Sequence, residues 1–214
     1  MGKNKNNTIS MTGNESMGWG YPDLKTFPRK EFSRTLDKIK KISPDIYLQY
    51  EPGIGNENLR LTIKNQKMGD FYANSINKIL ITPGGTFSIF LLAFFFKNIL
   101  GKKTIGIFLP CYDTALEIFK IIGLKVVNLS KKSKPDCIYI TPRYSNPSGN
   151  ILSKIQQNII NKYIKLGIYV IEDDVYNIFK YNNTQWKSYQ RRHPNQVFYI
   201  NSFSKLLAPG FRLG

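Results

Sequence analysis

The sequence has little of several residue types on which particular chemistries depend. Its two cysteines, Cys111 and Cys137, have neither the spacing of metal ligands nor that of a disulfide framework. Its single histidine, His193, lies in a polar loop before an apolar segment, where we expect it to be solvated. The sequence therefore predicts no metal site, and the scarcity of cysteine favours a reducing, cytoplasmic setting.

Long apolar runs are also absent. The longest, residues 87–96, is much shorter than the roughly 20 residues that cross a bilayer, so we expect a buried helix and no membrane partner. Residues 1–16 are polar and rich in asparagine, without the apolar core of a signal peptide.

Acidic residues are scarce as well, 14 against 31 lysines and arginines, which gives a net charge of +17. Such a charge can mark a surface for nucleic acid, or it can reflect a composition biased towards lysine, asparagine and isoleucine. The lysines are scattered over every segment, and the densest run, residues 131–134, is short. This favours the compositional interpretation, and we expect no specific nucleic-acid partner.

From residue 78 onwards, short apolar segments alternate with helical patterns. Strands are predicted at 78–82, 104–109, 125–129, 137–141, 168–172 and 197–201, and helices at 86–100, 115–122 and 154–166. This alternation is typical of an α/β three-layer sandwich with a mostly parallel sheet. Two earlier helices are predicted, at 28–41 and in a segment that carries Leu59, Ile63 and Met68. We expect residues 1–45 to form a flexible lead-in and N-terminal arm, and residues 46–214 to form one domain.

Ligands of such sheets bind beyond the carboxyl ends of the strands. The first predicted strand ends in Pro83-Gly84-Gly85-Thr86 and runs directly into a helix. Glycines allow a ligand to approach closely, and the start of a helix presents free N–H groups to an anion. The segment is either a phosphate cradle or only a tight turn. It is not a Walker loop, because no Gly-Lys-Ser/Thr follows.

Aromatic, amide and acidic side chains follow the next strands. Tyr112 can stack on a flat heterocycle or simply pack, and Asn146, in an Asn-Pro-Ser-Gly turn, can donate to a ring oxygen. The acids Glu172, Asp173 and Asp174 follow one another at the end of an apolar strand. Buried acids require solvent or a cationic partner, and a protonated ring nitrogen would be such a partner.

The last predicted strand leads into Ser202-Phe203-Ser204-Lys205 and then Arg212. A lysine whose pKa is lowered can form an imine with an aldehyde cofactor. An arginine offers a fork of donors to a phosphate.

These motifs, in this order and spacing, resemble those of the fold-type I pyridoxal-phosphate enzymes, specifically the class I and II aminotransferases. The resemblance covers about residues 18–214, and its most specific element is residues 202–214. It implies the large domain of that fold, pyridoxal 5'-phosphate as cofactor, an amino acid and a 2-oxo acid as substrates, and a homodimer. The opening segment, residues 20–28, resembles the arm that covers the substrate.

The resemblance also implies roles for individual residues. Lys205 matches the lysine that forms the aldimine and shuttles the proton, and Asp173 matches the carboxylate that pairs with the ring nitrogen. Asn146 and Tyr176 match the two groups that bind the phenolic oxygen of the ring, and Tyr112 matches the ring that stacks on it. The phosphate-binding set is matched by Gly85, Thr86, Ser202 and Arg212, with Tyr50 contributed by the neighbouring subunit.

The chain also departs from the family pattern. Relatives continue far beyond the lysine motif into a small domain, which holds the arginine for the substrate carboxylate. We therefore expect a chain truncated after that motif, with its C-terminal small domain and its last strand missing. Similar bacterial regulators carry a winged-helix domain ahead of the matched region, and we expect none here. Three functions stay open: transamination, another reaction on the same cofactor such as that of a lyase or decarboxylase, or binding of cofactor or a partner without efficient turnover.

Overall fold

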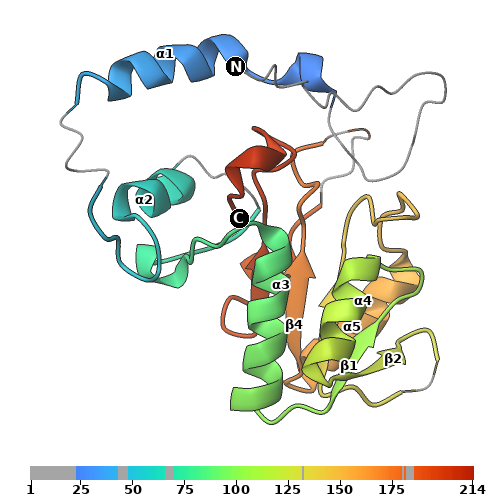
Figure 1. Cartoon of the computed structure of the whole chain (residues 1–214). Coiled ribbons are helices and arrows are strands. Elements are labelled where there is room, and N and C mark those ends of the chain that lie inside the picture. The colour runs from blue at the N-terminus through green and yellow to red at the C-terminus, as the bar shows by residue number, and fades with distance from the viewer. Residues whose placement is uncertain (1–22, 43–47, 66–69, 132, 180, 182–185) are drawn as a thin grey trace, which may run out of the picture.

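A computed structural model describes residues 23–42, 48–65, 70–131, 133–179, 181 and 186–214. Within them, five strands form one parallel sheet in the order β2-β1-β3-β4-β5 (Figure 1). The strands are β1 (Thr104–Ile107), β2 (Lys125–Asn128), β3 (Cys137–Ile140), β4 (Tyr169–Asp173) and β5 (Val197–Ile200). The predicted α/β fold with a mostly parallel sheet is confirmed.

The helices lie before the sheet, in the connections between its strands and, for one short turn, after its last strand. The α-helices are α1 (Arg29–Ile39), α2 (Glu57–Asn65), α3 (Gly85–Phe94), α4 (Asp113–Ile122), α5 (Lys154–Lys165) and α6 (Tyr189–Arg192). Shorter turns of helix are η1 (Leu24–Thr26), η3 (Ile76–Lys78), η4 (Phe95–Ile99) and η5 (Pro209–Phe211). The sequence pattern did not predict α6, which is only one turn long. Among the described residues, no helix has both the length and the apolar character needed to cross a membrane.

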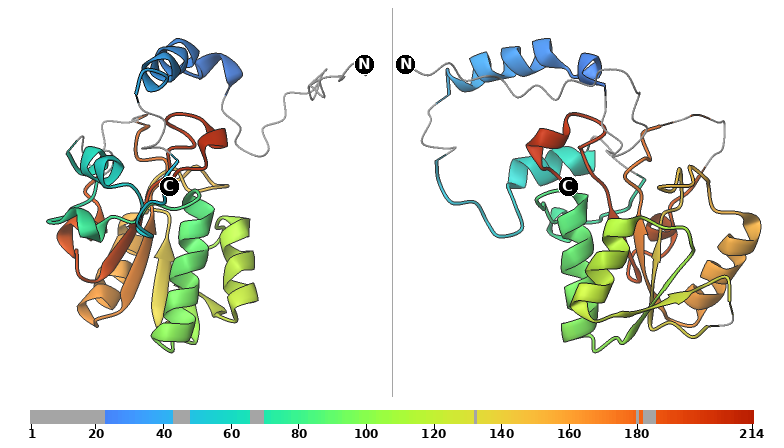
Figure 2. Two further views of the ribbon diagram at one scale, coloured as in Figure 1. Left: turned by 60° about the vertical axis from the view of Figure 1, so that its left-hand side comes forward. Right: turned by 45° about the vertical axis from the view of Figure 1, so that its right-hand side comes forward.

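Two apolar clusters, one on each face of the sheet, hold the layers together. On one face, α3 and α4 pack Ala93 and Phe119 against inward residues of the strands, among them Ile105. On the other face, α5 packs Ile160 and Ile164 against the alternate strand residues. The edge-on view at the left of Figure 2 shows the strands between these helix layers. Because side chains of a strand alternate between the faces, β3, β4 and β5 each contribute to both clusters.

The predicted strand at 78–82 is wrong. Residues 76–78 form a turn of 3-10 helix instead, and residues 79–82 belong to no strand of the sheet. An apolar groove of about 630 Å3 separates this segment from β5. Thr82 pairs instead with Gly214, through bonds of 2.9 Å and 3.1 Å in the two directions. The segment has the composition of a strand, but no strand of the sheet pairs with it. A strand forms only where a neighbouring strand accepts and donates its backbone hydrogen bonds.

The helix predicted at 86–100 is confirmed in type, but it is not buried all round. Ile89, Ala93 and Phe96 lie in the core, whereas Phe87, Phe90 and Phe94 are between 38% and 45% exposed. The α-helix also ends at Phe94 and continues as one turn of π-helix, η4. An apolar run by itself does not distinguish one buried face from two.

The helix predicted at 28–41 is confirmed as α1, which lies away from the sheet in Figure 1. None of its residues is buried, and its apolar side chain Phe32 packs edge-on against Phe211 at 5.5 Å. His193 is partly buried rather than solvated, and burial lowers its pKa. Residues 1–22 of the predicted lead-in and arm, and the predicted helical position of Met68, lie outside the described residues.

Candidate functional site

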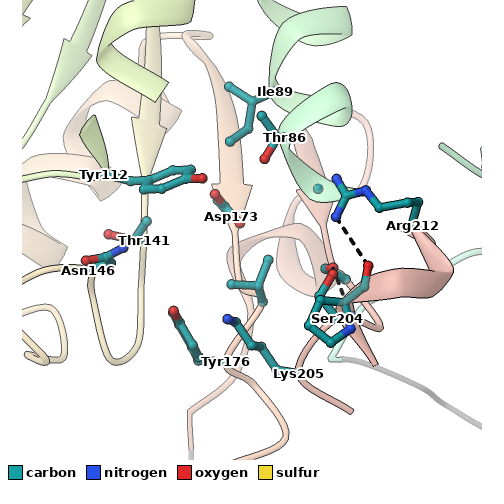
Figure 3. A pocket seen from close by; sticks show the side chains of 14 residues that line it. Thr86, Ile89, Tyr112, Thr141, Asn146, Asp173, Tyr176, Ser204, Lys205 and Arg212 are labelled. Carbon is teal, nitrogen blue, oxygen red and sulfur yellow. Dashed lines mark hydrogen bonds between the residues drawn. The ribbon is translucent and has the colours of Figure 1, made fainter. Parts of the chain in front are cut away.

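A pocket of about 230 Å3 opens at the carboxyl ends of the strands (Figure 3). Its walls come from the start of α3, the start of α4, and the loops that follow β3, β4 and β5. The residues that line it are Gly85, Thr86, Ile89, Tyr112, Thr141, Asn146, Asp173, Val175, Tyr176, Ser202, Ser204, Lys205, Pro209 and Arg212. The parallel topology thus gathers residues that lie up to 127 positions apart, since Gly85 and Arg212 face the same space.

One end of the pocket is built for an anion. Gly84 is the N-cap of α3 with φ +87° and ψ 163°, a backbone conformation that is almost restricted to glycine. A Cβ added there would lie 2.7 Å from an Arg212 guanidinium nitrogen, so the absence of a side chain lets Arg212 approach the helix start. That guanidinium also donates to the Pro83 carbonyl at 3.4 Å. Free N–H groups of the first helical turn and a guanidinium together favour a phosphate.

The hydroxyl of Ser202 adds to this end of the pocket. Ser202 is buried two residues after the end of β5, and its hydroxyl lies 3.0 Å from that of Ser204. The Ser202 Cβ lies 3.6 Å from the position that a Cβ on Gly85 would take, so the loop after β5 and the start of α3 are in close contact.

The amine and phenol needed for imine chemistry enter the pocket from the side opposite α3. In Figure 3 the side chains of Lys205 and Tyr176 both reach into the space below Asp173, and the ring of Tyr112 lies across from them. Burial lowers the pKa of the Lys205 amine, which raises the share of its nucleophilic neutral form. Burial raises the pKa of Tyr176, so its hydroxyl stays protonated and can donate a hydrogen bond.

Asp173 is the buried acid of the pocket. It is 6% exposed, and burial raises the pKa of its carboxyl from 3.8 to about 7. The Tyr139 hydroxyl donates to its Oδ2 atom at 2.6 Å. Its Oδ1 atom is buried and has no hydrogen-bond partner among the described residues. A buried carboxylate oxygen without a donor is unfavourable, and a ligand N–H in this pocket would satisfy it.

The neighbouring acids have partners away from the pocket. Glu172 lies on the other face of the sheet and accepts bonds from the Ser188 hydroxyl and from two backbone N–H groups at the start of α6. Asp174 forms a buried, two-point ion pair with Arg143 and also accepts from the Tyr199 hydroxyl. Of the three consecutive acids, Asp173 is therefore the one that faces the pocket with an oxygen to spare.

The structure brings together nearly all of the site residues predicted from the sequence. Tyr50 is the exception: its side chain is fully exposed and does not line the pocket. Sequence reasoning missed Tyr139, the donor to Asp173, and Arg143, the partner of Asp174. Tyr139 is the one aromatic residue of an otherwise aliphatic strand end, which is the only sign of it in the sequence. The pocket residues fit pyridoxal 5'-phosphate. The unpartnered Asp173 oxygen suits its ring nitrogen, the Lys205 amine suits its aldehyde, and the start of α3 with Arg212 suits its phosphate.

Comparison with known proteins gives a consistent result. The family model described as aminotransferase class I and II matches residues 41–214. The 2-aminoadipate transaminase of Thermus thermophilus is 23% identical over 92% of this chain. The HTH-type transcriptional regulator NorG of Staphylococcus aureus is 28% identical over 87% of it. Among solved structures, LysN of Thermus thermophilus, complexed with N-(5'-phosphopyridoxyl)-L-leucine, superposes with a TM-score of 0.78 at 23% identity, over 91% of this chain.

The chain spans about half the length of these relatives. It covers 53% of the transaminase, 44% of the regulator and 53% of the LysN chain. At these identities the structural likeness concerns the fold, and the match to the family model extends to the whole of the sheet and the pocket loops.

Proposed function

Because the chain belongs to the aminotransferase class I and II family, we propose that its pocket binds pyridoxal 5'-phosphate for the transfer of an amino group between an amino acid and a 2-oxo acid. The observation that carries the proposal is the buried, unpartnered Oδ1 atom of Asp173 in the same pocket as the Lys205 amine. When bound, the cofactor supplies an aldehyde that condenses with amines and a ring that accepts electrons.

In this proposal the protein holds the cofactor at three places. Arg212, Thr86, Ser202 and the start of α3 at Gly85 bind the phosphate. Asp173 accepts the ring N–H, and its negative charge keeps that nitrogen protonated. Asn146 and Tyr176 donate to the phenolic oxygen, while Tyr112 stacks on the ring. Together these contacts fix the ring relative to Lys205.

Lys205 has two proposed tasks. Its amine would hold the cofactor covalently, and burial favours the neutral form needed for this by lowering the pKa of the amine. When it is not engaged there, the same Nζ atom would hold and move a proton at the wall of the pocket. Because Lys205 is half-buried at the pocket wall, solvent competes weakly for that proton.

The test is a covalent label on Lys205. We expect the purified protein, given pyridoxal phosphate, to develop an absorbance band of an imine, and borohydride to fix one cofactor on Lys205, as located by peptide mass spectrometry. A Lys205→Ala variant should lose the label, and a Lys120→Met variant, changed at an exposed lysine of α4, should keep it. Labelling spread over surface lysines, with no band, would contradict the proposal.

A second candidate function is cofactor binding without efficient turnover. The cations among the residues that line the pocket are Lys205 and Arg212, both proposed here for the cofactor itself, so neither is left for a substrate carboxylate. The relative NorG, 28% identical, is described as a transcriptional regulator and not as a transaminase. Single-turnover assays distinguish the two: 2-oxo acid formed from an added amino acid indicates transamination, and an unchanged spectrum indicates binding alone.

The site is also proposed to be shared within a homodimer. The side chain of Tyr50 is fully exposed in one chain, as expected of a residue that reaches the phosphate of a neighbour. A two-fold interface uses the same surface on both chains, so each chain would complete the site of the other. Mixing a Tyr50→Phe chain with a Lys205→Ala chain should then restore function to some sites. No recovery on mixing, or a stable monomer that binds the cofactor, would contradict this arrangement.

A further inference from the structure

Tyr139 lies beneath the pocket rather than in its wall. It belongs to β3, its side chain is 1% exposed, and its ring packs edge-on against Phe119 of α4 at 5.3 Å. The register pairs Tyr139 with Ile171 on β4, and Asp173 follows two residues later on the same face of the sheet. The sheet itself therefore directs the Tyr139 hydroxyl towards Asp173, where it donates to Oδ2 at 2.6 Å.

Because of this hydrogen bond, the two carboxylate oxygens of Asp173 have different surroundings. Oδ2 is occupied by Tyr139, while Oδ1 has no partner among the described residues and belongs to a residue that lines the pocket. Without the hydroxyl, the carboxyl group could rotate and either oxygen could face the pocket. With it, one orientation is favoured, and that orientation leaves one oxygen for a ligand donor.

The neutrality of the donor matters as much as its position. Asp174, the next residue, is paired with the cation of Arg143, which compensates its charge. Burial raises the pKa of Tyr139 well above its usual value, so this side chain stays a neutral donor. Tyr139 therefore orients Asp173 without cancelling the negative charge that a protonated ring nitrogen would pair with.

Building on the proposed function, we propose that Tyr139 is a positioning residue that aims Asp173 at the ring nitrogen of the cofactor and keeps that nitrogen protonated. The Tyr139 hydrogen bond opposes the effect of burial on the pKa of Asp173. Removing it makes Asp173 a stronger base, so the proton moves from the ring nitrogen towards the carboxylate. The ring then loses both charge and affinity for the site.

The test compares Tyr139→Phe with the parent in cofactor binding. The change removes only the hydroxyl and keeps the ring that packs on Phe119. We expect the affinity for pyridoxal phosphate to fall about tenfold, the size of one lost hydrogen bond to a charged group. An analogue with carbon in place of the ring nitrogen should bind both proteins equally. The matched control is Tyr189→Phe, at an equally buried tyrosine of the opposite cluster, which should leave both affinities unchanged.

A spectroscopic measurement separates positioning from a general packing defect. With cofactor labelled with nitrogen-15 in its ring, the resonance of the parent should be that of a protonated pyridine. In Tyr139→Phe it should move towards the unprotonated position, and in Tyr189→Phe it should not move. Adding Tyr139→Phe to an Asp173→Asn background should change neither affinity nor resonance further, because the residue acts through Asp173.

The outcomes are distinct. If Tyr139→Phe folds poorly, 3-fluorotyrosine at position 139 keeps the shape and strengthens the donor, and it should hold the resonance at the protonated position. An unchanged affinity and resonance in Tyr139→Phe would overturn the role of Tyr139 while leaving the proposed function intact. Failure of the parent itself to bind pyridoxal phosphate would overturn both.

Discussion

Replacing Asp173 with asparagine should make the cofactor-free protein more stable at neutral and alkaline pH. The carboxyl group is buried, its Oδ1 atom has no partner among the described residues, and Asp174 next to it adds a like charge. All three features make the ionised form unfavourable in the folded chain. An asparagine can still accept the Tyr139 hydrogen bond but carries no charge, so the free-energy cost of burying an ionised carboxylate disappears.

The magnitude follows from the pKa of Asp173. Burial raises it from 3.8 to about 7. Between these values the unfolded chain has already released the proton that the folded chain still holds, so the free energy of unfolding falls as the pH rises through this window and is level above it. The window is roughly three pH units wide, which corresponds to roughly 4 kcal/mol.

Urea unfolding of the cofactor-free parent and of Asp173→Asn, at about pH 5 and about pH 8, measures this difference. Glu172, whose pKa is also raised to about 7, gives the parent a similar slope, so only the difference between variant and parent is informative. We expect the variant to gain several kcal/mol more at the higher pH. The control, Asp174→Asn, should instead lose roughly 3–5 kcal/mol, because it leaves Arg143 with a broken buried pair. An Asp173→Asn variant no more stable than the parent at about pH 8 would refute the reasoning.

Three further substitutions test the packing and hydrogen bonding of the fold. Gly84→Ala should destabilise the protein by roughly 1–3 kcal/mol in thermal melts and weaken phosphate binding in titrations, because a Cβ there would lie 2.7 Å from an Arg212 guanidinium nitrogen. The control Gly53→Ala, with open space around it, should change neither the stability nor the binding. Glu172→Gln should lower the free energy of unfolding, measured in urea, by roughly 1–3 kcal/mol. Both carboxylate oxygens accept hydrogen bonds, so the NH2 group of glutamine would face a donor and leave that donor without an acceptor. Gly106→Ala should lower the urea midpoint by an amount equal to roughly 1–3 kcal/mol, because its Cβ would meet Leu129 at 2.5 Å, and an unchanged midpoint would show that β1 can shift to make room.

The sequence predicted the site better than it predicted the edge of the sheet. Residues at the ends of parallel strands converge whatever the details of packing, and this is why Asn146, Asp173 and Lys205 could be expected in one pocket. Strand pairing, in contrast, depends on a neighbour that is distant in sequence. Residues 79–82 look like a strand, but in the structure Ile81 bonds to Ile54 and Thr82 to Gly214, and neither partner belongs to a strand.

The partners of the acidic residues were also beyond the reach of the local pattern. Three acids in a row cannot reveal which of them faces a ligand, because the answer depends on their partners Ser188, Arg143 and Tyr139, which lie elsewhere in the sequence. The family resemblance pointed to Asp173. The physical reason for that choice, one carboxylate oxygen left without a donor, needed the structure.

The acids Glu172, Asp173 and Asp174 also link the stability of the fold to the alignment of β4, which places Asp173 in the pocket. Glu172 is held on one face of the sheet by the start of α6, and Asp174 is held by Arg143 of the loop after β3. A slip of β4 by one residue would break both sets of bonds and bury two carboxylates without partners, at a cost of several kcal/mol. The neighbours therefore fix the position of Asp173, although its own burial is unfavourable. A ligand that brought an N–H donor to Oδ1 would offset that unfavourable term, so the atom that weakens the ligand-free fold would also favour binding of such a ligand.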